Sequence, residues 1–317
     1  MSRNSLNPPP HRLRADAALL GVAFIWGITF SLVKEALTDG PPCFFLALRF
    51  LIATIILSPF TLRGTGWPWR SGALLGILLA AGYITQTIGL QSIEPGRSAF
   101  LTGLAVVFVP LLGGLFRWDR LSRWDLFGTF LAWVGVTFLT GWIFHPGGRW
   151  QVGDLLTLAC AVTFALHILV VGRSSPRHSI LRLTWIQIVT ATILLGAGAF
   201  IFEPQAFQQA GNPVSGSPTF LGISTLFLFA AAGTGLFATA LAFLTQIRMQ
   251  RETTPTHTAV IFTMEPVFAA LFSIVVRHET AGLAEILGAL LILTGIFSVQ
   301  LGRSHQQNRR IKWQSIK

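Results

Sequence analysis

The sequence is poor in charged residues, which make up 11% of its 317 residues. A soluble globular chain carries about a quarter of its residues as charges. Hydrophobic residues make up 52% and the mean hydropathy is +0.64. So few charges cannot cover a water-facing surface. The low charge content is explained by apolar runs that are long enough to span a membrane. The composition excludes a soluble protein and makes the lipid bilayer the expected surroundings.

Residues that metal sites, cofactor sites and catalytic clusters need are also scarce. Cys43 and Cys160 lie in or beside apolar runs without metal-ligand spacing, which is typical of small core residues. The sequence has no phosphate-binding glycine loop and no His/Asp cluster. We therefore expect no metal, no cofactor and no enzyme activity. The net charge of +11 does not indicate nucleic acid, because the positive residues lie between apolar runs.

Ten apolar segments are long enough to span a membrane as helices, which satisfy their own backbone hydrogen bonds. They are residues 15–33, 43–60, 71–91, 97–116, 124–144, 153–172, 180–202, 219–242, 256–276 and 281–301. The first could mimic a signal peptide, but its length favours a retained helix. The longest connection, 203–218, is too short to form a domain.

Positive charges predict the orientation of these spans. Eighteen of the 23 Lys and Arg residues lie in alternate connections and the two tails, four lie in the other connections, and Arg49 lies inside a span. Cytoplasmic segments carry the excess of Lys and Arg. The pattern predicts an even number of spans with cytoplasmic tails at 1–14 and 303–317. The chain would then be a multi-pass protein of the inner (plasma) membrane.

An internal repeat is indicated by a proline in a span followed by two glycines seven residues apart. The two sets are Pro110, Gly128 and Gly135, and then Pro266, Gly288 and Gly295. Five spans per half would place the second copy upside down, which is an inverted repeat as found in many carriers. The predicted fold is therefore all-α, with ten transmembrane helices as two inverted five-helix repeats, 15–145 and 150–302. Chance similarity between apolar helices is the alternative, and the glycines are expected to serve close helix packing.

Several short motifs, in order and spacing, resemble the EamA-type, ten-helix branch of the drug/metabolite transporter superfamily. They are Trp26-Gly27 with Phe30, Arg49-Phe50, Ala99, Pro110, the stretch 265–270, His278-Glu279-Thr280 and the stretch 288–295. The resemblance covers nearly the whole chain. It implies a carrier, often an exporter of amino acids or related metabolites, with a cavity between the halves. The first copy departs from the second because it has Val109-Pro110 where the second has Glu265-Pro266, and so it lacks the glutamate.

Glu265 is the strongest candidate for a functional side chain. It lies near the middle of the ninth span, where ionisable residues are costly and usually functional. Pro266 follows it and cannot donate to the helix ladder, so we expect a kink there. The carboxyl group could bind a cationic group or take up a proton. It could instead hold the kink through a hydrogen bond to a neighbouring helix.

Other polar and aromatic side chains at mid-depth are candidates for the cavity wall, with ordinary helix packing as the alternative. They are Trp26 and Thr29, Tyr83 and Gln86, each pair three residues apart on one helix face, and His167. We interpret His257 as an interfacial residue. Arg49 is expected to anchor the structure by snorkelling outward or by pairing with Asp39 or Glu35.

These observations predict a secondary transporter that moves a small organic solute by alternating access. A membrane-embedded enzyme and a non-transporting scaffold are the alternatives. The sequence leaves open which solute is carried, in which direction and with what coupling. It also leaves the oligomeric state open, including a homodimer.

Overall fold

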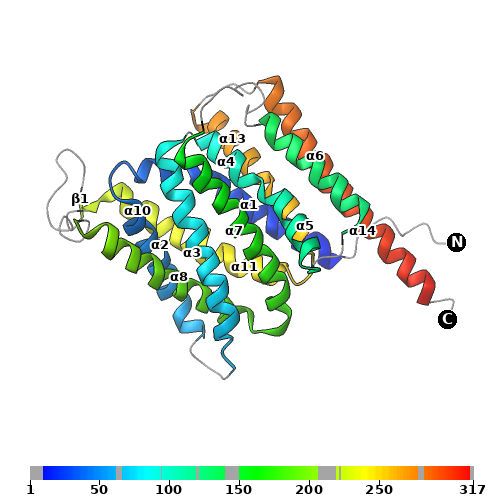
Figure 1. Cartoon of the computed structure of the whole chain (residues 1–317), viewed down its shortest axis with the longest axis horizontal. Coiled ribbons are helices and arrows are strands. Elements are labelled where there is room, and N and C mark those ends of the chain that lie inside the picture. The colour runs from blue at the N-terminus through cyan, green and yellow to red at the C-terminus, as the bar shows by residue number, and fades with distance from the viewer. Residues whose placement is uncertain are drawn as a thin grey trace.

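The structure is a computed structural model that describes residues 10–61, 66–93, 95–118, 121–139, 150–205, 219–220, 223–277 and 282–314. Nearly all of this part of the chain is helical, and the helices pack into one bundle (Figure 1). The all-α class and the polytopic character agree with the prediction. Some residues named from the sequence, among them His278, lie outside the described ranges.

The elements follow one another along the chain as helices with one short strand pair. They are α1 (Pro10–Ala36), α2 (Pro42–Thr61), α3 (Trp69–Ser92), α4 (Pro95–Gly103), α5 (Ala105–Leu115), α6 (Arg123–Leu139), α7 (Val152–Ser174), η2 (Ser175–Arg177), α8 (Ile180–Phe202), β1 (Thr219–Phe220), β2 (Ile223–Ser224), α10 (Thr225–Gly233), η3 (Thr234–Leu241), α11 (Ala242–Met249), α12 (Pro255–Phe262), α13 (Met264–Arg277) and α14 (Leu283–Gln314). β1 and β2 pair antiparallel.

Among the described residues, eight helical segments are long and apolar enough to cross a membrane. They correspond to eight of the ten predicted spans. The predicted fifth span forms α6, which has 17 residues, and the predicted ninth forms α12 and α13. These two segments are not among the eight, so the count of ten stays a prediction.

Two predicted spans are broken in the middle: the break in the fourth was not expected, and the break in the ninth lies three residues before Pro266, where a kink was expected. The fourth changes from α4 to α5 at Leu104, and the ninth changes from α12 to α13 at Thr263. At each break the backbone closes a tighter turn: the Leu104 amide donates to the Leu101 carbonyl (3.2 Å), and the Thr263 amide donates to the Val260 carbonyl (3.3 Å). Such i→i−3 bonds are typical of a 3₁₀ turn.

The eighth predicted span, 219–242, is wrong in its bounds. The helix begins with α10 at Thr225, because Ser224 caps it by accepting a hydrogen bond from the Phe227 amide (3.5 Å). It then widens into the π-helical segment η3 and continues as α11 to Met249. The predicted start of the span instead forms the β1–β2 pair.

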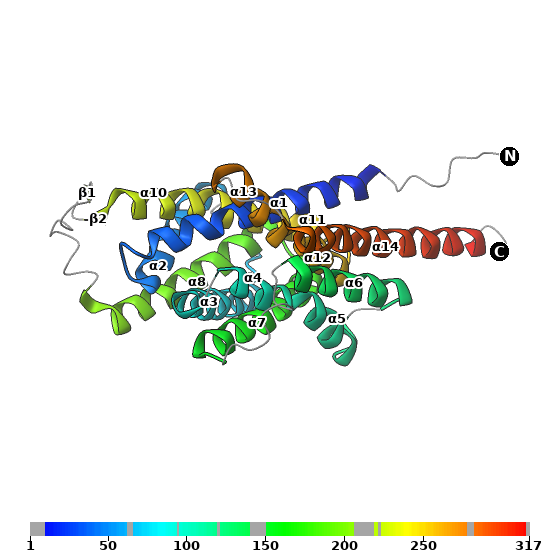
Figure 2. The same cartoon turned by 90° about the horizontal axis from the view of Figure 1, so that it is seen from above.

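The predicted structural glycines lie where α6 and α14 run side by side (Figures 1 and 2). A Cβ atom on Gly135 would stand 2.6 Å from the Gly288 carbonyl oxygen, and one on Gly128 would stand 2.6 Å from the Gly295 carbonyl oxygen. Only a residue without a side chain lets the two backbones approach this closely. Pro110 is buried in α5.

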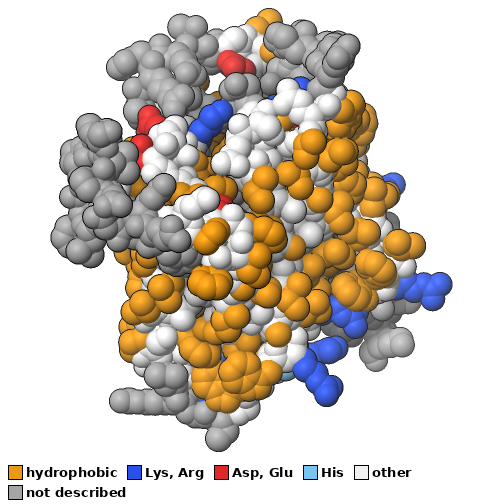
Figure 3. Space-filling model, turned by 60° about the vertical axis from the view of Figure 1, so that its left-hand side comes forward, with side chains coloured by type: hydrophobic (Ala, Val, Ile, Leu, Met, Phe, Trp, Pro, Cys, Tyr) orange, Lys and Arg blue, Asp and Glu red, His pale blue; other side chains and the backbone are white. Residues whose placement is uncertain are grey.

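The face drawn in Figure 3 carries a broad band of hydrophobic side chains, and most of the Lys and Arg side chains visible on it lie toward one end. Large apolar residues are openly exposed, for example Ile55 (61%), Ile193 (65%) and Phe229 (72%). This is the surface that lipid tails would cover. α1 begins and α14 ends at the same end of the molecule (Figure 2). Which side of the membrane that end faces stays a prediction.

Candidate binding cavity

A cavity of about 120 Å³ lies inside the bundle. A single water needs roughly 10–15 Å³, so a small organic molecule has room. α1, α3, α7, α11 and the two broken helices enclose it. All six residues that the sequence singled out for a cavity wall line it: Trp26, Thr29, Tyr83, Gln86, His167 and Glu265. Arg49 and Pro266, predicted as structural, line it too.

The two helix breaks meet at this cavity. Gly103 and Ala105 from the first break and Thr263 from the second are part of its wall. α1 lies directly against the start of α13, since a Cβ atom on Gly27 would stand 2.5 Å from the Glu265 carbonyl oxygen. Broken helices commonly build the binding sites of carriers, because their ends expose polar backbone groups.

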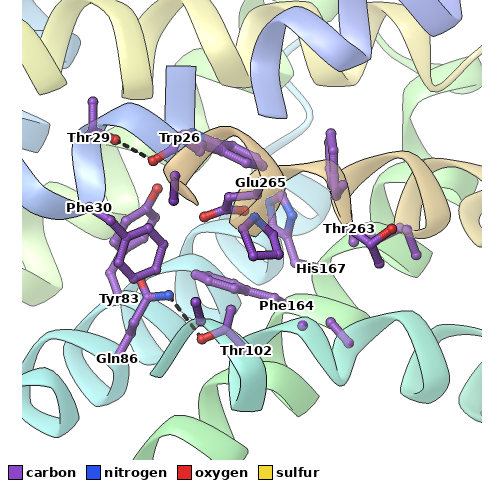
Figure 4. A pocket seen from close by; sticks show the side chains of 18 of the residues that line it. Trp26, Thr29, Phe30, Tyr83, Gln86, Thr102, Phe164, His167, Thr263 and Glu265 are labelled. Carbon is purple, nitrogen blue, oxygen red and sulfur yellow. Dashed lines mark hydrogen bonds between the residues drawn. The ribbon is translucent and has the colours of Figure 1, made fainter. Parts of the chain in front are cut away.

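Glu265 points into the middle of the cavity from the second residue of α13. Its side chain lies between Trp26 and Phe164, with Tyr83 and Gln86 along one side (Figure 4). Within the described ranges it makes no hydrogen bond and no ion pair. The start of a helix favours a negative charge. A carboxyl group in such surroundings needs a partner, and none comes from the residues that the structure describes.

Arg49 is buried and bound inside the bundle, so the prediction that it snorkels or pairs with Asp39 or Glu35 is wrong. Its side chain is 4% exposed. Nε donates to the Thr239 hydroxyl (2.7 Å), and Nη2 donates to the Tyr83 hydroxyl (3.1 Å) and the Ala238 carbonyl (3.2 Å). These groups of η3 and α3 solvate the guanidinium in place of water.

The remaining nitrogen of that guanidinium is free to meet a ligand. Arg49 Nη1 has no hydrogen-bond partner in the part of the chain that the structure describes, and the residue lines the cavity. The guanidinium carbon lies 4.7 Å from the centre of the Tyr83 ring, which holds the side chain in place. The cavity therefore carries a cation and a carboxyl group, each with bonding capacity left.

Aromatic rings form the walls between these groups. The Phe243 ring centre lies 5.5 Å from that of Trp26, 6.3 Å from that of Tyr83 and 5.7 Å from that of His167. Phe164 meets Tyr83 edge-on at 5.5 Å. Walls of this kind suit the apolar part of an organic molecule.

Two of the predicted polar side chains are held by neighbouring helices. Gln86 donates to the Thr102 hydroxyl (3.2 Å) across to α4. The imidazole of His167 lies 3.0 Å from the Gln187 side-chain oxygen on α8. Packing and cavity lining are thus combined in both residues. Their role in binding stays a prediction.

His257, which we interpreted as an interfacial residue, is buried between helices, and its depth in the membrane stays a prediction. It is 2% exposed, and its Nε2 lies 2.9 Å from a carboxylate oxygen of Asp16. α12 begins within the bundle, where Thr254 caps it by accepting from the His257 amide (3.3 Å). The first turn of α12 therefore faces α1 and not lipid.

Sequence reasoning missed several wall residues. Phe164 precedes His167 by three residues, and this helical spacing could have found it. Thr102, Phe243 and Gln246 also line the cavity. They reach it through contacts between helices far apart in the chain, for which a single sequence carries no signal.

The profile of the EamA-like transporter family matches residues 13–141 and again residues 151–301. The chain belongs to this family. Proteins of the EamA-like family similar to this chain are named as transporters and not as enzymes. The chain is accordingly a membrane transporter of the EamA type.

Relatives of this EamA-family chain match it over most of their length. An uncharacterised transporter of Archaeoglobus fulgidus is 33% identical over 290 residues, which is 92% of this chain and 87% of the relative. The uncharacterised inner membrane transporter YedA of Escherichia coli is 25% identical over 295 residues, 90% of each chain. A crystal structure with 19% identity superimposes with a TM-score of 0.74, covering 92% of this chain and 99% of the other, which shows a shared fold.

Proposed function

We propose that this transporter moves a small organic metabolite, an amino acid or related compound, by alternating access and exports it across the inner (plasma) membrane. The observation that carries the proposal is the cavity at the two helix breaks, in which Glu265 has no described protein partner. The name of the YedA relative, an inner membrane transporter, supports the location.

The cavity walls support a solute that carries a cationic group, an anionic group and an apolar part. A cationic group of the solute would face Glu265, and an anionic group would face the free Nη1 of Arg49. The rings of Trp26, Tyr83 and Phe243 would pack on its apolar side chain. An amino acid or an amino-acid derivative meets this description.

Two polar contacts between the proposed halves support alternating access. Near one end, Arg97 at the start of α4 binds Asp154 at the start of α7, with 2.6 Å between Nη2 and Oδ2. Near the other end, Asp16 of α1 accepts from Gln300 of α14 (3.0 Å) and meets His257 of α12. Opening one contact while the other stays closed would expose the cavity to one side at a time.

The decisive experiment is reconstitution of the purified full chain in liposomes, with uptake of labelled amino acids and amines measured with and without a pH gradient. We expect saturable flux of at least one compound above that of empty liposomes. Complete absence of flux for every compound would favour the scaffold, and chemical conversion of a compound would favour the membrane-embedded enzyme.

A matched pair of variants on α3 links the flux to the cavity. Gln86→Leu removes a polar group from the wall, whereas Gln91→Leu alters an exposed glutamine on the same helix. Loss of one neutral hydrogen bond corresponds to about a twofold to tenfold fall in apparent affinity. We expect this for Gln86→Leu alone, and equal effects of the two variants would contradict the proposed binding site.

A further inference from the structure

A second cavity, of about 160 Å³, lies between the start of α3 and the end of α7. Its wall combines two arginines, a histidine and two serines with three apolar residues. These are Arg173, Arg177, His178, Ser71, Ser174, Leu74, Trp118 and Val170. No acidic residue of the described ranges contributes to the wall. The cavity therefore offers hydrogen-bond donors and positive charge to an anion.

The donors are positioned by contacts with different elements. The guanidinium of Arg173 lies over the Trp118 ring, 4.8 Å from its centre. The Ser71 hydroxyl lies 3.2 Å from Nε2 of His178. Arg251 donates to the His178 carbonyl and fixes the turn after η2. Guanidinium and hydroxyl groups arranged around one space suit a phosphate group.

Tryptophans mark the depth of this cavity in the membrane. The rings of Trp67 and Trp69 stack with centres 5.6 Å apart, and Trp67 meets Trp185 at 5.5 Å. Trp67 and Trp69 lie at the start of α3, and Trp118 lines the cavity where α3 begins and α7 ends. Tryptophans gather at the level of lipid headgroups. The cavity therefore lies at headgroup depth.

Exposed apolar side chains lie on α3, which begins at the cavity, and on α5, which ends three residues before Trp118 of the cavity wall. On α3, Leu74 is 46% exposed and Ile77, one turn deeper, is 50% exposed. On α5, Leu111 is 61% exposed and Leu115 is 73% exposed. An acyl chain could follow these residues while its headgroup stays at the arginines. A free phosphate ion has no apolar part that could contact these residues.

We propose that this cavity binds the phosphate headgroup of an anionic phospholipid. Arg173 and Arg177, four residues apart, hold the phosphate, and the acyl chains run along α3 and α5. Basic pockets between transmembrane helices are a known way of recognising such headgroups. The site is separate from the central cavity and does not depend on the proposed solute.

The test is native mass spectrometry of the purified full chain in detergent with added phosphatidylglycerol or, separately, phosphatidylcholine. We expect tighter binding of phosphatidylglycerol. The variant Arg173→Gln/Arg177→Gln should weaken it by about twentyfold or more, because each arginine near the headgroups is worth about fivefold. Arg123→Gln is the matched control, since the Arg123 guanidinium lies over a different tryptophan, Trp124, at 5.7 Å.

Three results would overturn the proposal. One is equal binding of the two lipids, and another is equal affinity of the double variant and the control. The third is displacement of phosphatidylglycerol by millimolar inorganic phosphate, which would assign the cavity to a free anion. If the double variant does not fold, the single variant Arg177→Gln replaces it, because Arg177 is exposed and its substitution should leave the fold intact. Loss of this one arginine should weaken binding of phosphatidylglycerol by about fivefold.

Discussion

The two broken helices, α4–α5 and α12–α13, resemble each other in sequence pattern but differ in what they bring to the cavity. Pro110 is the sixth residue of α5, whereas Pro266 is the third residue of α13. Val109 is therefore carried away from the break into the core, where it is 0% exposed. Glu265 stays at the break and lines the cavity. The residue before the proline is therefore part of the packed core in the first broken helix and part of the cavity wall in the second.

The largest expected effect comes from giving the first copy the acid of the second. Val109→Glu would bury a carboxylate without a partner, which costs about 3–5 kcal/mol of unfolding free energy. Glu265→Val should change it by less than about 1 kcal/mol, because that side chain has no described protein partner to lose. Thermal unfolding in detergent measures both. Similar losses in the two variants would show that the two sites are alike after all.

The second effect concerns transport. Glu265→Gln keeps the size of the side chain but removes its charge, and a hydrogen bond to a charged group is worth about 1.5–3 kcal/mol. We expect the transport rate in proteoliposomes to fall about tenfold to a hundredfold and the effect of a pH gradient to disappear. Glu265→Asp, which keeps the carboxylate, is the control. An unchanged rate and pH profile for Glu265→Gln would remove this residue from the mechanism.

The smallest effect is expected at the contact between α6 and α14, to which each helix contributes a glycine. Gly135→Val and Gly288→Val should each lower the unfolding free energy by about 1–3 kcal/mol, because each forces the same backbone contact apart. Gly196→Ala in α8 is the control, since nothing lies within 4 Å of its Cβ position. That change should be neutral or stabilise by up to about 1 kcal/mol. Clearly different losses at Gly135 and Gly288 would contradict a shared contact.

Much of the architecture could be predicted from composition and periodicity, because each apolar run must form a helix in lipid. The cavity residues could be named because polar groups at mid-depth are rare, and a spacing of three residues puts Tyr83 and Gln86 on one face. The number of ten spans, the membrane sidedness and the division into two inverted repeats stay predictions.

The break between α4 and α5 and the partners of Arg49 could not be predicted, whereas Pro266 did indicate a kink close to the break between α12 and α13. Gly103 stands directly before Leu104, but glycine is common inside membrane-spanning helices and does not by itself mark a break. The partners of Arg49 on η3 lie about 190 residues away in the chain. Nothing in the sequence around Arg49 indicates that the π-helical segment η3 would supply its partners. The nearby acids Asp39 and Glu35 were therefore the obvious, and wrong, choice.

One backbone oxygen connects two walls of the central cavity. The Ala238 carbonyl accepts from Trp26 Nε1 (2.9 Å) and from Arg49 Nη2 (3.2 Å), so helices α1 and α2 both rest on η3. A small rotation of η3 would shift an indole and a guanidinium together. A molecule that displaces the indole would thereby also shift the position of the guanidinium, although the two side chains come from separate helices.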